Sequence, residues 1–208
     1  MRVPPAARPF ATVAAAALLA GSLAGCKTTA LSDITGSLGP RPTQAAADAD
    51  PHRAIAALGE RYRANPRNAD AALRYGQALR TNGQRAQAAA VLEQATIANP
   101  GNRALLAAYG RALADNGSYQ QAFDTLSRAH SPANPDWRIL SVQGTALDHL
   151  GRHNDARGYY EAALKIAPGE PTVLSNLGMS YMLTKDLAKA EQALRQAYTN
   201  GRADTRVR

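Results

Sequence analysis

The sequence is poor in cysteine and in aromatic residues, and both shortages narrow the choice of fold. The single cysteine, Cys26, cannot form a disulfide within the chain and leaves a cysteine-based zinc site without partners. Among 208 residues there are only one Trp, eight Tyr and two Phe, whereas 46 residues are alanine. Alanine favours helices, and the scarcity of aromatic residues disfavours a sheet. Because 45% of the residues are hydrophobic, we expect an all-α chain with a buried core.

Acidic residues are also under-represented relative to basic ones. The chain has 24 Lys and Arg against 16 Asp and Glu, which gives a net charge of +8. This excess favours acidic partners or an anionic surface without choosing between them. The arginines are spread through the sequence and are not interleaved with aromatic residues, as a nucleic-acid site would require. We therefore predict a solvated basic surface and no nucleic-acid partner.

The four histidines show no catalytic or metal-binding pattern. None of His52, His130, His149 and His153 stands at a recognisable spacing from both a carboxylate and a nucleophile. His149 and His153 are separated by Gly151, which marks a turn, so they do not share a helical face as zinc ligands would. The chain also lacks a glycine-rich phosphate loop. We expect no enzymatic activity, no metal, no cofactor and no small-molecule substrate.

Residues 1–25 have the features of a secretory signal peptide. Arg2 and Arg8 precede a stretch of small and apolar residues at 10–23, which is shorter than the about 20 residues of a membrane-spanning helix. A retained transmembrane anchor remains the alternative.

Residues 26–51 have no sustained periodicity and contain Gly36, Gly39, Pro40 and Pro42, so they are predicted to form a flexible linker.

The end of the signal, Leu23-Ala24-Gly25-Cys26, resembles the lipobox of bacterial lipoproteins. This resemblance implies cleavage before Cys26 and attachment of lipid to Cys26, with a chance cysteine in a buried helix as the alternative. Several acyl chains give a stable membrane anchor, whereas one does not. Lys27 stands where such lipoproteins carry an aspartate for inner-membrane retention. The resemblance therefore implies an outer-membrane protein that faces the periplasm.

The remainder of the chain repeats with a period of 34 residues. Three series share this step: Gly76, Gly110, Gly144 and Gly178; Ala88, Ala122, Ala156 and Ala190; and Leu92, Leu126, Tyr160 and Leu194. Four full repeats are predicted at 69–204, preceded by a partial repeat or capping helix at 52–68. Residues 205–208 would begin a further, truncated repeat. We therefore expect either a longer natural chain or a partner that covers the last repeat.

The spacing and residue types resemble those of the tetratricopeptide repeat. This resemblance implies a right-handed superhelical solenoid of helix-turn-helix units. The helix pairs are predicted at 69–81 with 85–98, 103–115 with 119–130, 137–149 with 153–166, and 171–183 with 187–199. A glycine inside a helix costs about 1 kcal/mol relative to alanine, so the four glycines indicate close helix packing. The alanine series offers the matching small surface, and the bulky series is expected to fill the space before the next repeat.

In tetratricopeptide repeats the first helix of each pair lines a concave groove. The resemblance places the following residues in that groove: Asp70, Leu73, Gln77, Arg80, Ala104, Ala107, Arg111, Ala114, Arg138, Ser141, Thr145, Asp148, Thr172, Ser175, Asn176, Met179 and Met182. Methionine suits adaptable apolar contacts, which favours an extended peptide or a partner helix. Alternatively, Met179 and Met182 pack beneath a further repeat. Ser141 and Thr145 replace the Lys and Asn of known carboxylate clamps, so we do not predict that clamp.

A lipoprotein signal followed by these repeats resembles the TadD-type lipoproteins of Flp (tight adherence) pilus assembly. The similarity includes the repeat at Gly144–Pro168 and the stretch Asn176–Tyr181. It implies a non-catalytic, pilotin-like role, in which the groove binds a pilus secretin or another pilus component. An adaptor for peptidoglycan enzymes or for outer-membrane protein assembly is the alternative.

Overall fold

A computed structural model describes the backbone of residues 51–206 and the side chains of residues 51–201. The predicted signal peptide at 1–25, the lipidation site Cys26 and the linker up to residue 50 lie outside the described residues. All described residues belong to one unit, residues 42–208.

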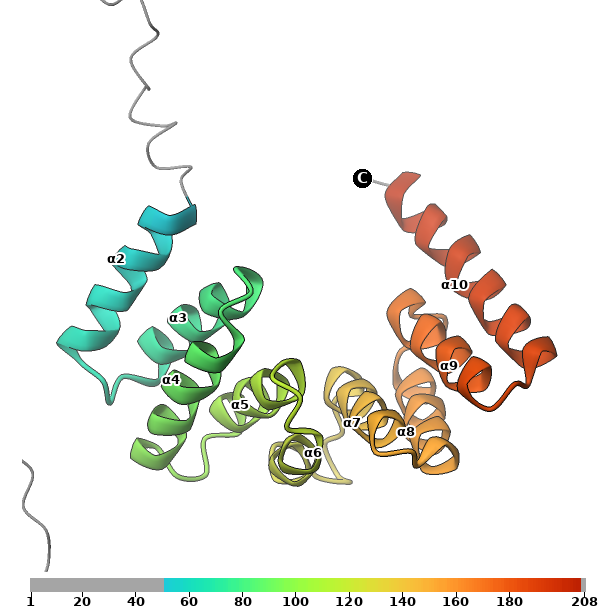
Figure 1. Cartoon of the computed structure of the whole chain (residues 1–208), viewed down its shortest axis with the longest axis horizontal. Helices are drawn as coiled ribbons and strands as arrows, with labels where there is room; N and C mark the ends of the chain where they lie inside the picture. Colours follow the sequence, from blue (N-terminus) through green and yellow to red (C-terminus); the bar gives the residue numbers. More distant parts are fainter. Residues whose placement is uncertain (1–50, 207–208) are drawn as a thin grey trace, which may run out of the picture. The chain divides into compact units, whose positions relative to one another are not determined.

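Within residues 51–206 the secondary structure is helical, apart from one isolated bridge between Ser131 and Asn134. The helices are α2 (Pro51–Ala64), α3 (Ala69–Thr81), α4 (Arg85–Ala98), α5 (Arg103–Asp115), α6 (Tyr119–Ser127), α7 (Trp137–His149), α8 (His153–Ile166), α9 (Pro171–Leu183) and α10 (Leu187–Arg206). They follow one another in space in chain order (Figure 1). The all-α fold predicted from composition and periodicity is confirmed.

Six of the eight helices predicted in the repeats coincide with observed helices, and two differ at their carboxyl ends. Helix α6 stops at Ser127 rather than at residue 130. After Ser127 the chain forms three-residue hydrogen bonds, such as that from the Ala129 N–H to the Leu126 carbonyl, and Pro132 follows shortly afterwards. Helix α10 continues past residue 199 to Arg206. The positions that correspond to Arg202 in the other repeats hold proline or asparagine. Because arginine does not end a helix as proline does, α10 continues. The predicted start of a new repeat at 205–208 is therefore wrong for Thr205, which is helical.

Each tight turn within a helix pair contains one residue with a left-handed backbone. Gly83, Gly117 and Gly151 have φ angles of 76°, 83° and 76°, and Lys185 has a φ angle of 62° at the corresponding position. Glycine adopts this conformation without steric cost, whereas a residue with a side chain does not. The turn geometry thus explains three of the glycines that recur with the repeat, and the fourth repeat adopts the same turn against the preference of lysine.

The glycines in the middle of the first helices each accept a bulky side chain from the second helix of the same repeat. A Cβ atom placed on Gly144 would lie 2.6 Å from Cε1 of Tyr160, and one on Gly110 would lie 2.5 Å from Cγ of Leu126. The same pairing joins Gly76 to Leu92 and Gly178 to Leu194. The bulky series therefore packs inside each helix pair, and Leu92 and Tyr160 also share hydrophobic clusters with residues of the next repeat, as expected.

Neighbouring repeats are joined because each first helix also packs against the second helix of the repeat before it. Thus α5 contacts α4, α7 contacts α6, and α9 contacts α8. Leu105 of α5 shares a hydrophobic cluster with Leu79 and Leu92, and Val173 of α9 shares one with Tyr160. A single repeat cannot bury its apolar surface alone, so this stacking builds the core of the solenoid.

Candidate partner-binding groove

The residues predicted to line the groove differ widely in exposure. The exposed ones are Asp70, Gln77, Ala104, Arg138, Thr172, Met179 and Met182. The half-buried ones are Leu73, Arg80, Arg111, Ala114, Thr145, Asp148, Ser175 and Asn176. Ser141 and Ala107 are buried, and the hydroxyl of Ser141 accepts a hydrogen bond from the Asn176 amide at 3.2 Å. Ser141 therefore joins repeats 3 and 4 and presents little surface to a partner.

Three arginines of the predicted groove lie on three successive first helices, and the charges of two of them act on the third. They are Arg80 of α3, Arg111 of α5 and Arg138 of α7. Nε of Arg80 donates to Oδ2 of Asp115 at 2.6 Å, and the guanidinium of Arg138 lies 4.4 Å from the ring centre of Trp137. Burial lowers the pKa of Arg111, and the charges of Arg80 and Arg138 lower it further, against the opposing effect of Asp136.

Asp148 is the centre of a hydrogen-bond network that ties repeat 3 to repeat 4. Its Oδ2 accepts from the Tyr160 hydroxyl at 2.9 Å, and its Oδ1 accepts from the Ser180 hydroxyl at 2.8 Å. Nδ1 of His153 lies 2.9 Å from the same Oδ1. Because the Asp148 side chain is only 10% exposed, it acts mainly as a structural bridge rather than as an open contact for a partner.

The pairing of His153 with Asp148 gives one histidine a carboxylate partner that the sequence spacing did not indicate. The sequence did not reveal it because the two residues lie on opposite sides of the turn at Gly151. Ser180 donates to Asp148 rather than to the imidazole, so these residues do not form a nucleophile–base–orienter chain. The arrangement gives no activated nucleophile.

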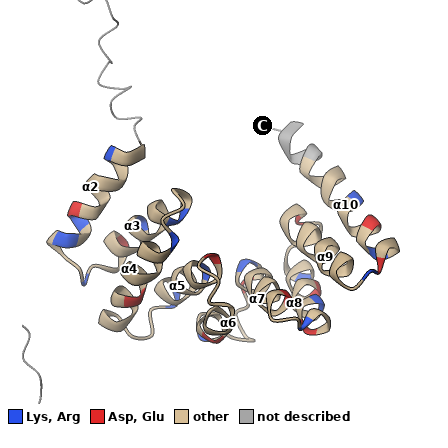
Figure 2. Ribbon diagram, in the orientation of Figure 1, with Lys and Arg blue, Asp and Glu red and all other residues tan. Residues whose placement is uncertain are grey.

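A pocket of about 380 Å³ lies beside this network, between repeats 3 and 4. His149 and His153 from repeat 3 and Met179 and Leu183 of α9 are among the residues that line it. Large apolar side chains on the same face of α9 are exposed: Met179 is 52% exposed, Met182 45% and Leu183 57%. Helix α9 carries no charged residue, unlike the neighbouring helices (Figure 2). We call Met179, Met182 and Leu183 the apolar face.

A second pocket, of about 400 Å³, lies where α5 and α7 begin. Ala104 and Ala107 of α5 and Trp137 and Arg138 of α7 are part of its wall. Behind it, the buried Gln143 accepts from Nε2 of His130 and donates to the Ser127 hydroxyl, at 3.0 and 2.9 Å. The sequence pattern does not predict the buried amide of Gln143. The corresponding positions in the other repeats are Tyr75, Tyr109 and Leu177, none of which carries an amide.

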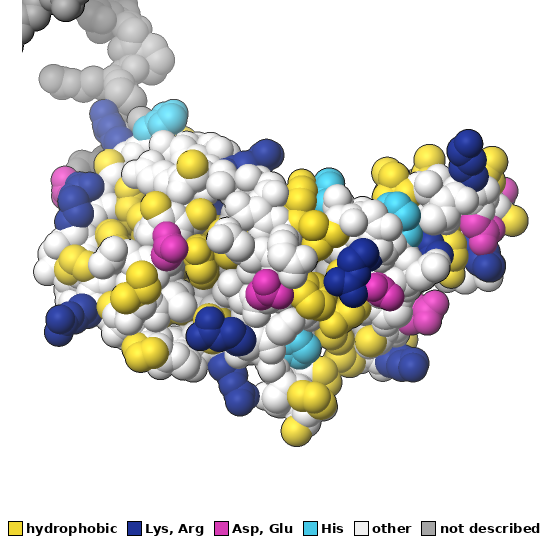
Figure 3. Space-filling view, turned by 60° about the horizontal axis from the view of Figure 1, so that its bottom comes forward, with side chains coloured by type: hydrophobic (Ala, Val, Ile, Leu, Met, Phe, Trp, Pro, Cys, Tyr) yellow, Lys and Arg dark blue, Asp and Glu magenta, His cyan; other side chains and the backbone are white. Residues whose placement is uncertain are grey.

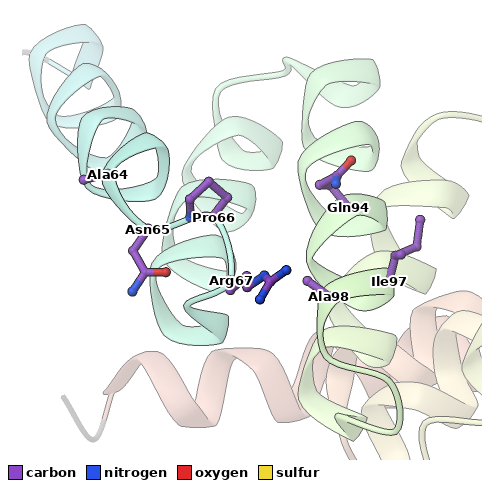
Figure 4. A pocket seen from close by; sticks show the side chains of 7 residues that line it. All are labelled: Ala64, Asn65, Pro66, Arg67, Gln94, Ile97 and Ala98. Atoms are coloured by element: carbon purple, nitrogen blue, oxygen red, sulfur yellow. The ribbon is translucent and has the colours of Figure 1, made fainter.

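A hollow of about 730 Å³ lies away from the first helices, between the end of α2 and the end of α4. Figure 4 shows Arg67 extending from the α2–α3 connection toward Ala98, with Gln94 and Ile97 on α4. Arg67 is the one ionisable side chain among the residues that line this hollow. It offers neither a general base nor a nucleophile, so we assign no chemistry to it.

The surface does not concentrate its charge on the face shown in Figure 3. Basic side chains are spread between several separate hydrophobic patches. Among residues 51–206, no helix is both long enough and apolar enough to cross a membrane. The part of the chain that the structure describes also contains no group of three His, Cys, Asp or Glu side chains that could hold a metal ion.

The comparisons with known proteins agree with this architecture. The tetratricopeptide repeat family model matches residues 120–171 and 141–205, and a model described as anaphase-promoting complex, cyclosome, subunit 3 matches residues 52–129. No curated protein matches the chain by sequence.

The fold is similar to several solved structures of MamA. MamA 41-end from Desulfovibrio magneticus RS-1 is 19% identical, with 77% of this chain and 90% of that chain covered and a TM-score of 0.64. A further MamA crystal structure is 21% identical, with 78% and 95% covered and a TM-score of 0.62. MamA AMB-1 is 25% identical, with 74% and 90% covered and a TM-score of 0.61.

The described chain is therefore an all-α solenoid of tetratricopeptide repeats. Solenoids of this kind offer extended concave surfaces to binding partners, and the fold is typical of protein-protein interaction.

Proposed function

We propose that this chain is a non-catalytic scaffold that binds a protein partner along the groove formed by α3, α5, α7 and α9. The apolar face is the observation that carries this proposal. Exposed large apolar side chains that gather in one place mark interaction surfaces, and methionine adapts to varied partners. The absence of an activated nucleophile around Asp148 agrees with a role in binding.

The geometry of repeat 3 indicates what kind of partner fits the apolar face. Thr145, Asp148 and His149 of repeat 3 occupy the register positions of Met179, Met182 and Leu183, and they lie in the pocket that α9 helps to close. The same positions in repeat 4 are thus shaped to receive a helix or an extended segment. Because α9 has no charged residue, the complementary surface of the partner is apolar.

In this proposal the scaffold is a lipoprotein, anchored through Cys26 to the outer membrane and facing the periplasm. The support comes from the basic start of the chain, the apolar stretch at 10–23 and the lipobox-like Leu23–Cys26. The specific role is to assist assembly of the Flp (tight adherence) pilus machinery, with a pilus secretin or another pilus component as partner. The combination of this signal with the repeats supports that role.

Crosslinking followed by pull-down from native envelopes tests the proposal. The unmodified chain is compared with Met179→Glu/Met182→Glu, and Ile97→Glu on α4 serves as the control, since Ile97 is also an exposed apolar residue but lies outside the first helices. We expect a pilus component with the unmodified chain and with Ile97→Glu, and its loss with the double variant. Recovery of peptidoglycan enzymes or outer-membrane assembly subunits instead would assign the scaffold to the rival adaptor role. Equal recovery by all three chains would contradict the use of the groove.

A further inference from the structure

A hollow of about 470 Å³ lies between α6 and α8, on the second helices of repeats 2 and 3. In the described chain the backbones of these two helices do not pack against each other. The rings of Phe123 and Tyr159 bridge the gap edge to face, with their centres 5.6 Å apart. Leu140 and Ala162 add further apolar surface to its wall. None of the described residues that line this hollow belongs to the predicted groove, so it is a separate surface, which we call the aromatic hollow.

The repeat pattern does not require the two rings. The positions that correspond to Phe123 in the other repeats are Ala89, Arg157 and Glu191, and those that correspond to Tyr159 are Val91, Thr125 and Ala193. Both rings rest partly on the core below and are half-buried, so part of each ring stays in contact with water. Aromatic side chains that are partly open to solvent are the groups that protein interfaces favour. The aromatic hollow is therefore a feature of this pair of repeats and not of the solenoid as a whole.

A glycine in the wall of the hollow is not explained by contacts within the described chain. Gly158 lies inside α8, where a glycine costs about 1 kcal/mol relative to alanine. It is exposed, and a Cβ atom placed on it would meet no atom within 4 Å, unlike one on Gly144. Its backbone does not have the left-handed conformation that favours glycine either. The missing side chain leaves room for the main chain of another molecule to approach α8 closely.

The shape and the charge of the hollow select a protein segment as its occupant. Because the hollow is open along one side, it cannot enclose a small molecule as a ligand pocket does. The charged residues in its wall, Arg152 and Asp155, form an ion pair at 2.7 Å, so an apolar group meets no unpaired charge there. Lys165 lies one turn beyond Ala162 on the same side of α8, exposed and without an ion pair in the described part of the chain. An acidic residue one turn from the apolar anchor of the occupant complements this lysine.

We propose that the aromatic hollow binds an amphipathic helix of a second protein, distinct from the partner in the groove. A large apolar side chain of that helix packs on the rings of Phe123 and Tyr159, and its backbone crosses α8 at Gly158. An Asp or Glu three or four residues away on the same helix face reaches Lys165. The scaffold thereby holds two proteins at once, one on its first helices and one on its second helices. This inference needs the fold and does not depend on which protein binds the groove.

Site-specific photocrosslinking of the full chain in native envelopes tests the site. The probe is p-benzoylphenylalanine in place of Glu161, an exposed residue one turn from Gly158 on α8. Mass spectrometry of the crosslinked product then identifies the segment that lies against the hollow. We expect a segment of a second protein that carries a large apolar residue with an Asp or Glu three or four positions away.

Gly158→Ala separates docking from folding, whereas the rings are left intact because they also support the core. The added methyl group stands where the occupant approaches, so we expect about tenfold less crosslinked product. The same change removes a glycine from a helix interior, so the melting temperature should rise and unfolding cannot explain the loss. Lys165→Glu should lower the yield by about fivefold. Lys185→Glu, the same charge change on the exposed turn before α10, should leave it within about twofold.

Several results would overturn the inference. These are the absence of a crosslinked protein, an equal yield with Gly158→Ala, or a crosslink to another copy of this chain, to lipid or to nucleic acid.

The variant Met179→Glu/Met182→Glu distinguishes the hollow from the groove. If it abolishes capture of the groove partner while the crosslink at position 161 persists, both proposals stand. Loss of both together would show that one partner spans both surfaces and would contradict a second protein. Normal capture by the double variant, with a crosslink that still depends on Gly158, would refute the proposed groove function and leave the hollow standing.

Discussion

Adding one methyl group at Gly144 tests the packing on which the helix pairs depend. Three atoms of the Tyr160 ring lie 2.6 to 2.9 Å from the position that a Cβ atom on Gly144 would take. The ring is 1% exposed, and its hydroxyl is held by Asp148, so it cannot swing aside into solvent. Overpacking of this kind costs about 3 kcal/mol at the upper end of the usual range, against a gain of about 1 kcal/mol in helix propensity. Gly144→Ala should therefore lower the free energy of unfolding by about 2 kcal/mol.

Gly158 provides the matched control. It lies inside α8, and a Cβ atom there would have no neighbouring atom within 4 Å. Gly158→Ala should therefore raise stability by about 1 kcal/mol through helix propensity alone. For a chain of this size, about 1 kcal/mol shifts the melting temperature by about 2–4 °C, so the two variants should move in opposite directions when helix signal is followed during heating.

A double-mutant cycle identifies the cause of the effect. In a Tyr160→Ala background the ring is gone, and Gly144→Ala should then stabilise the chain as Gly158→Ala does. Equal increases in melting temperature for Gly144→Ala and Gly158→Ala in the natural background would refute the packing argument. A penalty at Gly144 that persists without the Tyr160 ring would refute it as well.

Three further predictions concern the buried network and the anchor. Asp148→Ala leaves the Ser180 hydroxyl without its acceptor and leaves the Tyr160 hydroxyl only the longer bond to Thr145 Oγ1 at 3.3 Å, so it should lower the free energy of unfolding by about 3 kcal/mol. Asp155→Ala at an exposed ion pair should change it by less than about 1 kcal/mol in chemical denaturation. Burial, reinforced by Asp148, raises the pKa of Tyr160 above its ordinary 10.0. The folded chain therefore keeps this phenol protonated while the unfolded chain ionises it, so stability is full below about pH 10 and falls above it; denaturation at pH 9 and 11 should show a smaller fall for Tyr160→Phe. Cys26→Ser should release the protein from membrane fractions in sedimentation, and unchanged membrane association would contradict the lipid anchor.

The periodicity of the sequence was sufficient to predict the helix pairs. A 34-residue step with glycine at four register positions admits few alternatives, and α3, α4, α5, α7, α8 and α9 begin and end at the predicted residues. The errors occur where the pattern weakens. Helix α6 precedes a loop in which Asn134 replaces the proline of the other repeats, and α10 has Arg202 at that position. Local rules for helix ends then decide the boundary, and the repeat pattern does not.

The groove was harder to predict because a register position does not determine exposure. Met179 and Met182 are exposed, as a binding role requires, but Ser141 is buried because Asn176 of the next repeat covers it. The network around Asp148 joins residues from both helices of repeat 3 and from α9. Such contacts depend on how adjacent repeats stack, and the 34-residue pattern of one chain carries no signal for them. The binding role of these groove residues therefore stays a prediction.

The bridge between Asp148 and Ser180 makes the repeats unequal as building blocks. The positions that correspond to Ser180 in the first three repeats are Ala78, Ala112 and Ala146, which need no acceptor. Removing residues 137–170 would keep the 34-residue period, yet it would set the fully buried Ser180 hydroxyl against Ala114 instead of Asp148. Gain or loss of whole units during evolution, or in the laboratory, is therefore easier ahead of repeat 3 than at its junction with repeat 4. Any shortened chain that deletes this unit would need a compensating Ser180→Ala.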